Sequence, residues 1–185
     1  MKIKLIIGLF LCVCFAQIIT PLSMIARREF VLKHGAQYKF KVAPVDPYDA
    51  FRGRYVALRF EEDYCLCAKE DKLNSGQQVY ALINVDDHGF AKFSGLAVNR
   101  PDTGPYIKTR LNYISGDKAY LDIPIDRYYM EESAAPRAEK VYQQHVRSGK
   151  EDAYAIIRIQ DGMAVIESLY VAGERIESLV DSLSN

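Results

Sequence analysis

The chain begins with a long run of apolar residues. Residues Leu5–Ile25 read LIIGLFLCVCFAQIITPLSMI, and no charged side chain lies between Lys4 and Arg27. A helix needs about 20 consecutive apolar residues to cross the hydrocarbon core of a bilayer. The pattern therefore predicts a transmembrane anchor over residues 1–26. Pro21 is expected to kink this helix or to mark the point where it leaves the hydrocarbon.

The same run allows two other interpretations. A cleaved signal peptide also has a basic start, an apolar stretch and small residues at its cleavage site, and Cys14 and Ala16 before Gln17 fit that description. A buried core helix is the second alternative, although soluble helices seldom run this long without a charge. We favour an uncleaved anchor because the apolar run continues past Gln17.

The charges that flank the run give conflicting signals about its orientation. Lys2 and Lys4 favour a cytoplasmic N-terminus, whereas Arg27 and Arg28 at the other end favour the reverse. The N-terminal tail is very short and a whole domain follows the run. We therefore expect one crossing, membrane lipid around residues 5–25, and a domain outside the cytoplasm.

The remainder of the chain carries the period-two alternation that is typical of β-strands. Residues 28–43 predict two strands separated at His34–Gly35, and residues 54–60 predict a third. Three further pairs of strands each flank a glycine-containing polar turn, as hairpins do. These pairs are Val79–Val85 with Phe90–Val98, Tyr106–Ile114 with Lys118–Ile123, and Tyr154–Ile159 with Met163–Val171. Gly95 inside its strand predicts a bulge or a bend.

One amphipathic helix is expected from Pro136 to about Ser148, where apolar residues recur at helical spacing before Gly149. The predicted fold class is mainly β (α+β): an N-terminal transmembrane helix followed by an antiparallel β-barrel or sandwich with one packed helix. The extracytoplasmic domain would cover residues 27–173, and residues 174–185 would form a frayed C-terminal tail.

Charge excludes one broad class of function. The whole chain has 24 basic and 24 acidic residues, and removing Lys2 and Lys4 leaves 22 basic against 24 acidic residues. Binding to nucleic acid relies on a surplus of basic residues, which this domain lacks. We therefore expect no nucleic-acid partner.

The cysteines and histidines offer little chemistry. Cys65 and Cys67 would lie on one face of a strand, where a bridge across one residue is disfavoured and where they supply only half of a zinc site. Packing is the favoured role, with a redox function as the weaker alternative. The three histidines lack the spacing of metal ligands, so neither a metal nor a cofactor is predicted.

A polar loop with two aspartates and two arginines is the first candidate site. Asp46 and Asp49 could act as carboxylates, Arg52 and Arg54 could pair with anions, and Tyr55 could supply a hydroxyl. The structural interpretation is that the aspartates accept hydrogen bonds from turn amides and pair with the arginines. Both interpretations stay open on sequence alone.

A second candidate is the aromatic pair Tyr128 and Tyr129, followed by Glu131 and Glu132. Paired carboxylates can act as acid and base where burial separates their pKa values. Neighbouring residues on a strand point to opposite faces, so this pair is expected to be solvated or to form salt bridges with the first motif.

The segment Pro44–Phe60, PVDPYDAFRGRYVALRF, resembles the core motif of the GDYxxLxY family of membrane-anchored bacterial proteins. Gly53, Tyr55 and Leu58 fall on that motif, and the segment from Ile125 to Glu132 resembles the second block of the family. The resemblance implies a single-pass protein of the bacterial inner (cytoplasmic) membrane. It also implies no assigned activity and, by association, a multipass membrane protein as partner.

Two positions depart from the family motif. Arg54 stands where the family has aspartate, and Phe60 stands where it has the last tyrosine. The first departure argues against chemistry at that position. The favoured hypothesis is an anchored module that binds another membrane or envelope protein. The alternative is an extracytoplasmic hydrolase that uses Asp46, Asp49 or Glu131.

Overall fold

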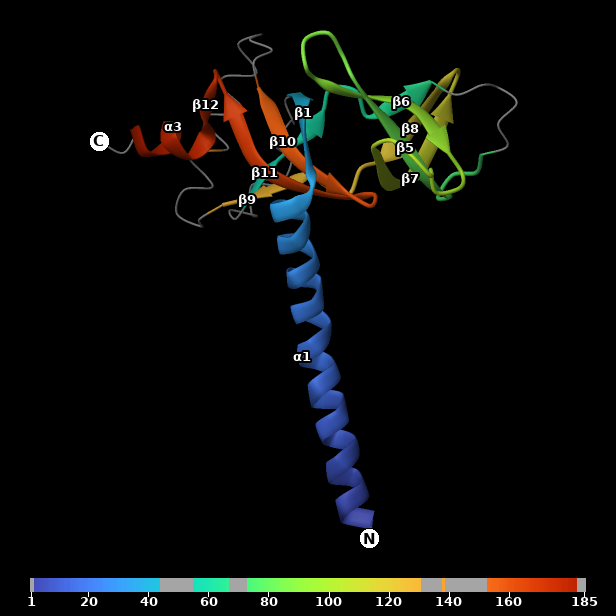
Figure 1. Ribbon diagram of the computed structural model, residues 1–185, viewed down its shortest axis with the longest axis vertical. Helices are drawn as coiled ribbons and strands as arrows, with labels where there is room; N and C mark the ends of the chain where they lie inside the picture. The colour runs from blue at the N-terminus through green and yellow to red at the C-terminus, as the bar shows by residue number, and fades with distance from the viewer. Residues whose placement is uncertain (1, 44–54, 67–72, 131–137, 139–152, 183–185) are drawn as a thin grey trace.

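The computed structural model describes residues 2–43, 55–66, 73–130, 138 and 153–182, and Figure 1 shows a long helix that carries a β-rich domain at one end. Helix α1 spans Lys2–His34, and from Ile6 to Ile25 its large apolar side chains are exposed rather than packed on the domain. It is the one described helix that is long and apolar enough to cross a membrane. Pro21 lies within α1 and does not end it.

The prediction of a strand before His34 was wrong, because α1 continues to His34 and strand β1 (Ala36–Ala43) begins after Gly35. Val31, on the last turns of the helix, is only 4% exposed, and the N–H group of Gly35 donates a 2.7 Å hydrogen bond to its carbonyl. Burial of this helix face against β10 (Tyr154–Gln160) and β11 (Met163–Val171) therefore holds the segment in helical form.

Two five-stranded sheets make up most of the domain. The first has the order β12-β11-β10-β1-β3, and the second has the order β4-β8-β7-β5-β6, with every named pair antiparallel. The remaining bounds are β3 Arg59–Phe60, β4 Tyr64–Leu66, β5 Gln78–Val85, β6 Ala91–Ala97, β7 Tyr106–Ser115, β8 Lys118–Asp122 and β12 Glu174–Arg175.

The three predicted hairpins are confirmed as β5–β6, β7–β8 and β10–β11. The turn between β10 and β11 has Asp161 at φ 51° and Gly162 at φ 79°, the two consecutive positive φ angles of a type I′ turn. The predicted irregularity at Gly95 is also confirmed, since the register between β5 and β6 shifts there.

The two sheets share one hydrophobic core. Phe40 of β1 packs against Phe60 of β3 and Phe93 of β6, each with ring centroids 5.6 Å apart. Isolated parallel bridges also link the sheets, at Lys39–Phe90 and at Ile107–Gly162. The mainly β class and the N-terminal apolar helix are thus confirmed. The described strands form no closed barrel, so the choice between barrel and sandwich stays a prediction.

The C-terminal segment is packed, in contrast to the frayed tail that was predicted. Strand β12 pairs with β11, and helix α3 (Ile176–Ser182) follows it with Ile176 and Val180 fully buried. The short helix persists because these two side chains fill the core. Of the helix predicted from residue 136, the structure describes Ala138, which is helical and buried.

Candidate functional site

The two candidate motifs pair directly with each other. Strand β2 (Tyr55–Ala57) forms a two-stranded antiparallel ladder with β9 (Arg127–Tyr129), in which Tyr55 lies opposite Tyr129. The N–H group of Leu58 extends the contact with a 2.8 Å hydrogen bond to the carbonyl of Asp126. Segments far apart in the sequence therefore form one element at the base of the domain, beside α1 (Figure 1).

Alternation along this ladder separates the site residues into two groups. Leu58 and Tyr128 are buried in the core, whereas Tyr129 is 60% exposed. Tyr55 is described through its backbone pairing. Leu58 therefore has a packing role, and Tyr129 is a described motif side chain that solvent reaches. The other predicted residues lie outside the described part of the chain: Asp46, Asp49, Arg52, Gly53, Arg54 and Glu131.

Tyr128 connects the second motif to the C-terminal helix. Its hydroxyl donates a hydrogen bond to Oε1 of Glu177, and Nε of Arg175 lies 3.6 Å from Oε2 of the same carboxylate. Burial, followed by the hydrogen bond to Glu177, raises the pKa of Tyr128 far above its ordinary value. The phenol is therefore a neutral donor that fixes α3 onto β9, and it is not poised as an acid or a base.

Sequence reasoning missed Glu177 and Arg175 because both lie in the segment assigned to a frayed tail. A signal was present, since Ile176, Leu179 and Val180 recur at helical spacing. Seven residues are too few for that pattern to predict a helix reliably.

A groove of about 810 Å³ lies where α1 meets the domain. Its walls are the last turns of α1, the β9 motif strand and the hairpin between β10 and β11. The charged residues that line it are Arg27, Arg28, Glu29, Lys108, Asp126, Arg127 and Asp161. The groove lies between the β9 motif strand and the end of α1, so it is a candidate binding surface on this face.

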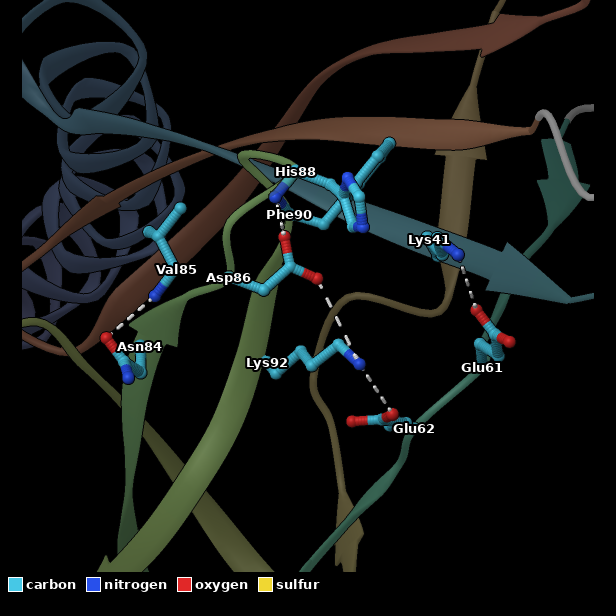
Figure 2. A network of polar contacts seen from close by, with 9 residues as sticks. All are labelled: Lys41, Glu61, Glu62, Asn84, Val85, Asp86, His88, Phe90 and Lys92. Carbon is cyan, nitrogen blue, oxygen red and sulfur yellow. Dashed lines mark hydrogen bonds and ion pairs between the residues drawn. The ribbon is translucent and has the colours of Figure 1, made fainter.

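A second polar cluster lies in the turn before β6 (Figure 2). Oδ1 of Asp86 accepts hydrogen bonds from the backbone N–H groups of Phe90, at 2.9 Å, and His88, at 3.0 Å. The bond from Phe90 is the main cause that lowers the pKa of the Asp86 carboxyl. This arrangement is an Asx-type turn, which gives Asp86 a structural role in the connection between β5 and β6.

Lysines extend this cluster across neighbouring strands (Figure 2). Nζ of Lys92 lies 3.1 Å from Glu62 and 4.0 Å from Asp86, while Lys41 lies 3.9 Å from Glu61. The hydrogen bond with Glu62 is the main cause that raises the pKa of Lys92. All these groups keep access to solvent, so the cluster stabilises the junction of β1, β3 and β6 weakly. The hollow that Lys41, Glu61, Glu62 and Lys92 help to line measures only about 20 Å³, which is room for a water molecule and not for a larger ligand.

Cys65 is a core residue. It is 1% exposed, and its Sγ lies 3.5 Å from the carbonyl of Gly95, to which the thiol donates a weak hydrogen bond. This burial agrees with the packing role, while Cys67 lies outside the described residues. Among the residues that the structure describes, no group of three or more His, Cys, Asp or Glu side chains could hold a metal ion.

Comparison with known proteins gives one match. The family model described as GDYXXLXY protein matches residues 17–169, which include both motif segments, the first two hairpins and all but the last two residues of the third. No curated protein and no solved structure matches the chain significantly. Because the family model covers most of the chain, the chain belongs to the GDYXXLXY family.

Proposed function

We propose that this protein is a binding or accessory module, anchored by α1 in the bacterial inner membrane with its domain on the extracytoplasmic side. Its partner would be another membrane or envelope protein, which it would contact through the face formed by β2 and β9. An apolar helix with exposed side chains, joined to a compact domain, supports the anchoring part of this proposal.

The pairing of the two motif segments is the observation that carries the proposal. Tyr55 and Tyr129 occupy opposite positions in the backbone register of the β2–β9 ladder, and Tyr129 borders the end of α1. Tyr129 is 60% exposed although it belongs to a motif strand, and tyrosine is enriched in protein interfaces. An exposed aromatic side chain next to the anchor is well placed to contact a neighbour in the same membrane.

Site-specific crosslinking in native membranes tests the contact. A photo-crosslinking phenylalanine analogue would replace Tyr129 in the full-length protein. The matched control would replace Tyr113 of β7, which is 50% exposed and does not line the groove. We expect the analogue at position 129 to capture one defined membrane or envelope protein that the control does not capture. Equal capture at both positions, or none at position 129, would refute the proposed surface.

Anchoring needs its own measurement. We expect the unprocessed full-length chain to stay in the membrane pellet after alkaline carbonate extraction, and a protease added outside the inner membrane to digest the domain. Release of the chain by carbonate, or protection of the domain until the membrane is broken, would contradict the proposed anchor or its orientation respectively.

A further inference from the structure

The described residues that line the groove between α1 and the domain carry four basic and three acidic side chains. Two of these three acidic side chains pair with bases that do not line the groove. Glu29 pairs with Lys33 at 3.8 Å, and Asp161 pairs with Arg100 at 2.7 Å. The third, Asp126, pairs with Arg127 inside the groove at 3.6 Å.

The charges of three basic side chains of the groove are therefore not offset by any of these acids. Arg27 and Arg28 come from α1 and Lys108 comes from β7, and none of the three forms an ion pair with a described residue. All three are exposed, so they are available to an anion from outside. Two guanidinium groups and an ammonium group around one cavity provide N–H donors, and the oxygens of a phosphate diester can accept hydrogen bonds from them.

The position of the groove suggests where that phosphate would come from. Ile25, the last residue of the apolar run, lines the same cavity as Arg27 and Arg28. A mainly apolar hollow of about 400 Å³ lies alongside, lined by residues that include Phe30, Val31 and Met163. Cationic groups beside an apolar surface at the end of a membrane span match an amphiphile with an anionic headgroup.

We propose that the groove holds the headgroup of an anionic phospholipid from the bilayer that α1 spans. The lipid phosphate binds Arg27, Arg28 and Lys108, and the adjoining apolar hollow covers the first part of an acyl chain. This inference rests on the anchoring part of the proposed function. The bound lipid fixes the tilt of the domain against the membrane, because it contacts both α1 and the domain.

Lipid retention tests the inference. The full-length protein would be reconstituted in vesicles of equal parts phosphatidylglycerol and phosphatidylcholine, extracted in mild detergent, and analysed for both lipids by mass spectrometry. We expect phosphatidylglycerol to be enriched over phosphatidylcholine. We also expect Arg28→Gln and Lys108→Gln each to lower that enrichment about fivefold, the effect of one basic residue at an anionic surface.

Arg110→Gln is the matched control. Arg110 is exposed on the same face of β7, two residues beyond Lys108, and does not line the groove. We expect this variant to retain lipid like the natural protein. Equal retention of the two lipids by the natural protein, or an equal loss in all three variants, would overturn the inference.

Two measurements on the same variants separate this inference from the proposed function. If phosphatidylglycerol is not enriched while the chain resists carbonate and position 129 still crosslinks, the lipid site alone is wrong. If the chain is released by carbonate, anchoring and the lipid site are both wrong. If Lys108→Gln abolishes crosslinking and leaves lipid retention unchanged, a protein occupies the groove and the lipid inference is overturned.

Discussion

Gly35 forms the junction between α1 and β1, and its replacement by alanine tests whether that junction is as tight as the structure indicates. Its N–H group bonds to the carbonyl of Val31, while its own carbonyl accepts a 3.2 Å hydrogen bond from Nη1 of Arg158. A Cβ atom at Gly35 would lie 2.6 Å from that Val31 oxygen, 3.1 Å from the backbone nitrogen of Ile159 and 3.2 Å from Cβ of Arg158.

The cost of Gly35→Ala is steric, because the φ angle of Gly35 lies outside the left-handed region. The crowded atoms belong to backbone or sit next to it, so they cannot rotate away. Overpacking of this kind costs about 1–3 kcal/mol. The lower entropy of the unfolded chain offsets about 0.4–1 kcal/mol of that cost. We therefore expect a net loss of about 1–2 kcal/mol in the free energy of unfolding.

Thermal unfolding of the full-length protein in detergent, followed by circular dichroism, measures the effect. A loss of this size lowers Tm by about 2–8 °C in a domain of this length. Gly95→Ala is the control, since its Cβ would make only an ordinary 3.8 Å contact with Leu82 and its φ angle is also not left-handed. Equal Tm values for Gly35→Ala, Gly95→Ala and the natural protein would refute the steric argument and the rigid junction.

Three further predictions concern the domain. Tyr128→Phe should lower the free energy of unfolding by about 1–3 kcal/mol, because it removes the hydroxyl that donates to Oε1 of Glu177; a denaturant midpoint equal to that of the natural protein would contradict this. Asp86→Asn should be less stable than the natural protein at neutral pH, since a lowered pKa stabilises the fold above the ordinary value of 3.8. The difference should close as the pH falls below that value, and a pH-independent difference would refute the charge argument. A membrane-impermeant maleimide should label Cys65 only after unfolding, as site-resolved mass spectrometry can show, and rapid labelling of the folded protein would contradict its burial.

The hairpins could be predicted from the sequence because their signals are local. Period-two alternation and glycine in the connecting turns are sufficient to predict both strands of β10–β11 and the turn at Asp161 and Gly162. The apolar run from Leu5 to Ile25 is equally local, and its length alone predicts a candidate membrane span. Each of these features depends on residues within one element or its nearest neighbour.

Residues 28–34 and 174–182 show where local reasoning fails. Both segments are short, and neither has a pattern strong enough to distinguish helix, strand and coil. Burial of Val31 against β10 and β11 keeps the first segment helical, and burial of Ile176 and Val180 orders the second. The strands that cover Val31 lie far along the chain, and the hydrogen bond that holds Glu177 comes from Tyr128 of β9, so no local window contains the information.

The sequence by itself determined the apolar helix, the predominance of antiparallel strands and the two motif segments. Only the tertiary structure decided that β2 pairs with β9, that Leu58 and Tyr128 face the core while Tyr129 faces outward, and that this pair lies beside the end of α1. Periodicity predicts which residues share a face of a strand. The choice of partner strand depends on how the whole core closes, and that closure is a property of all the elements together.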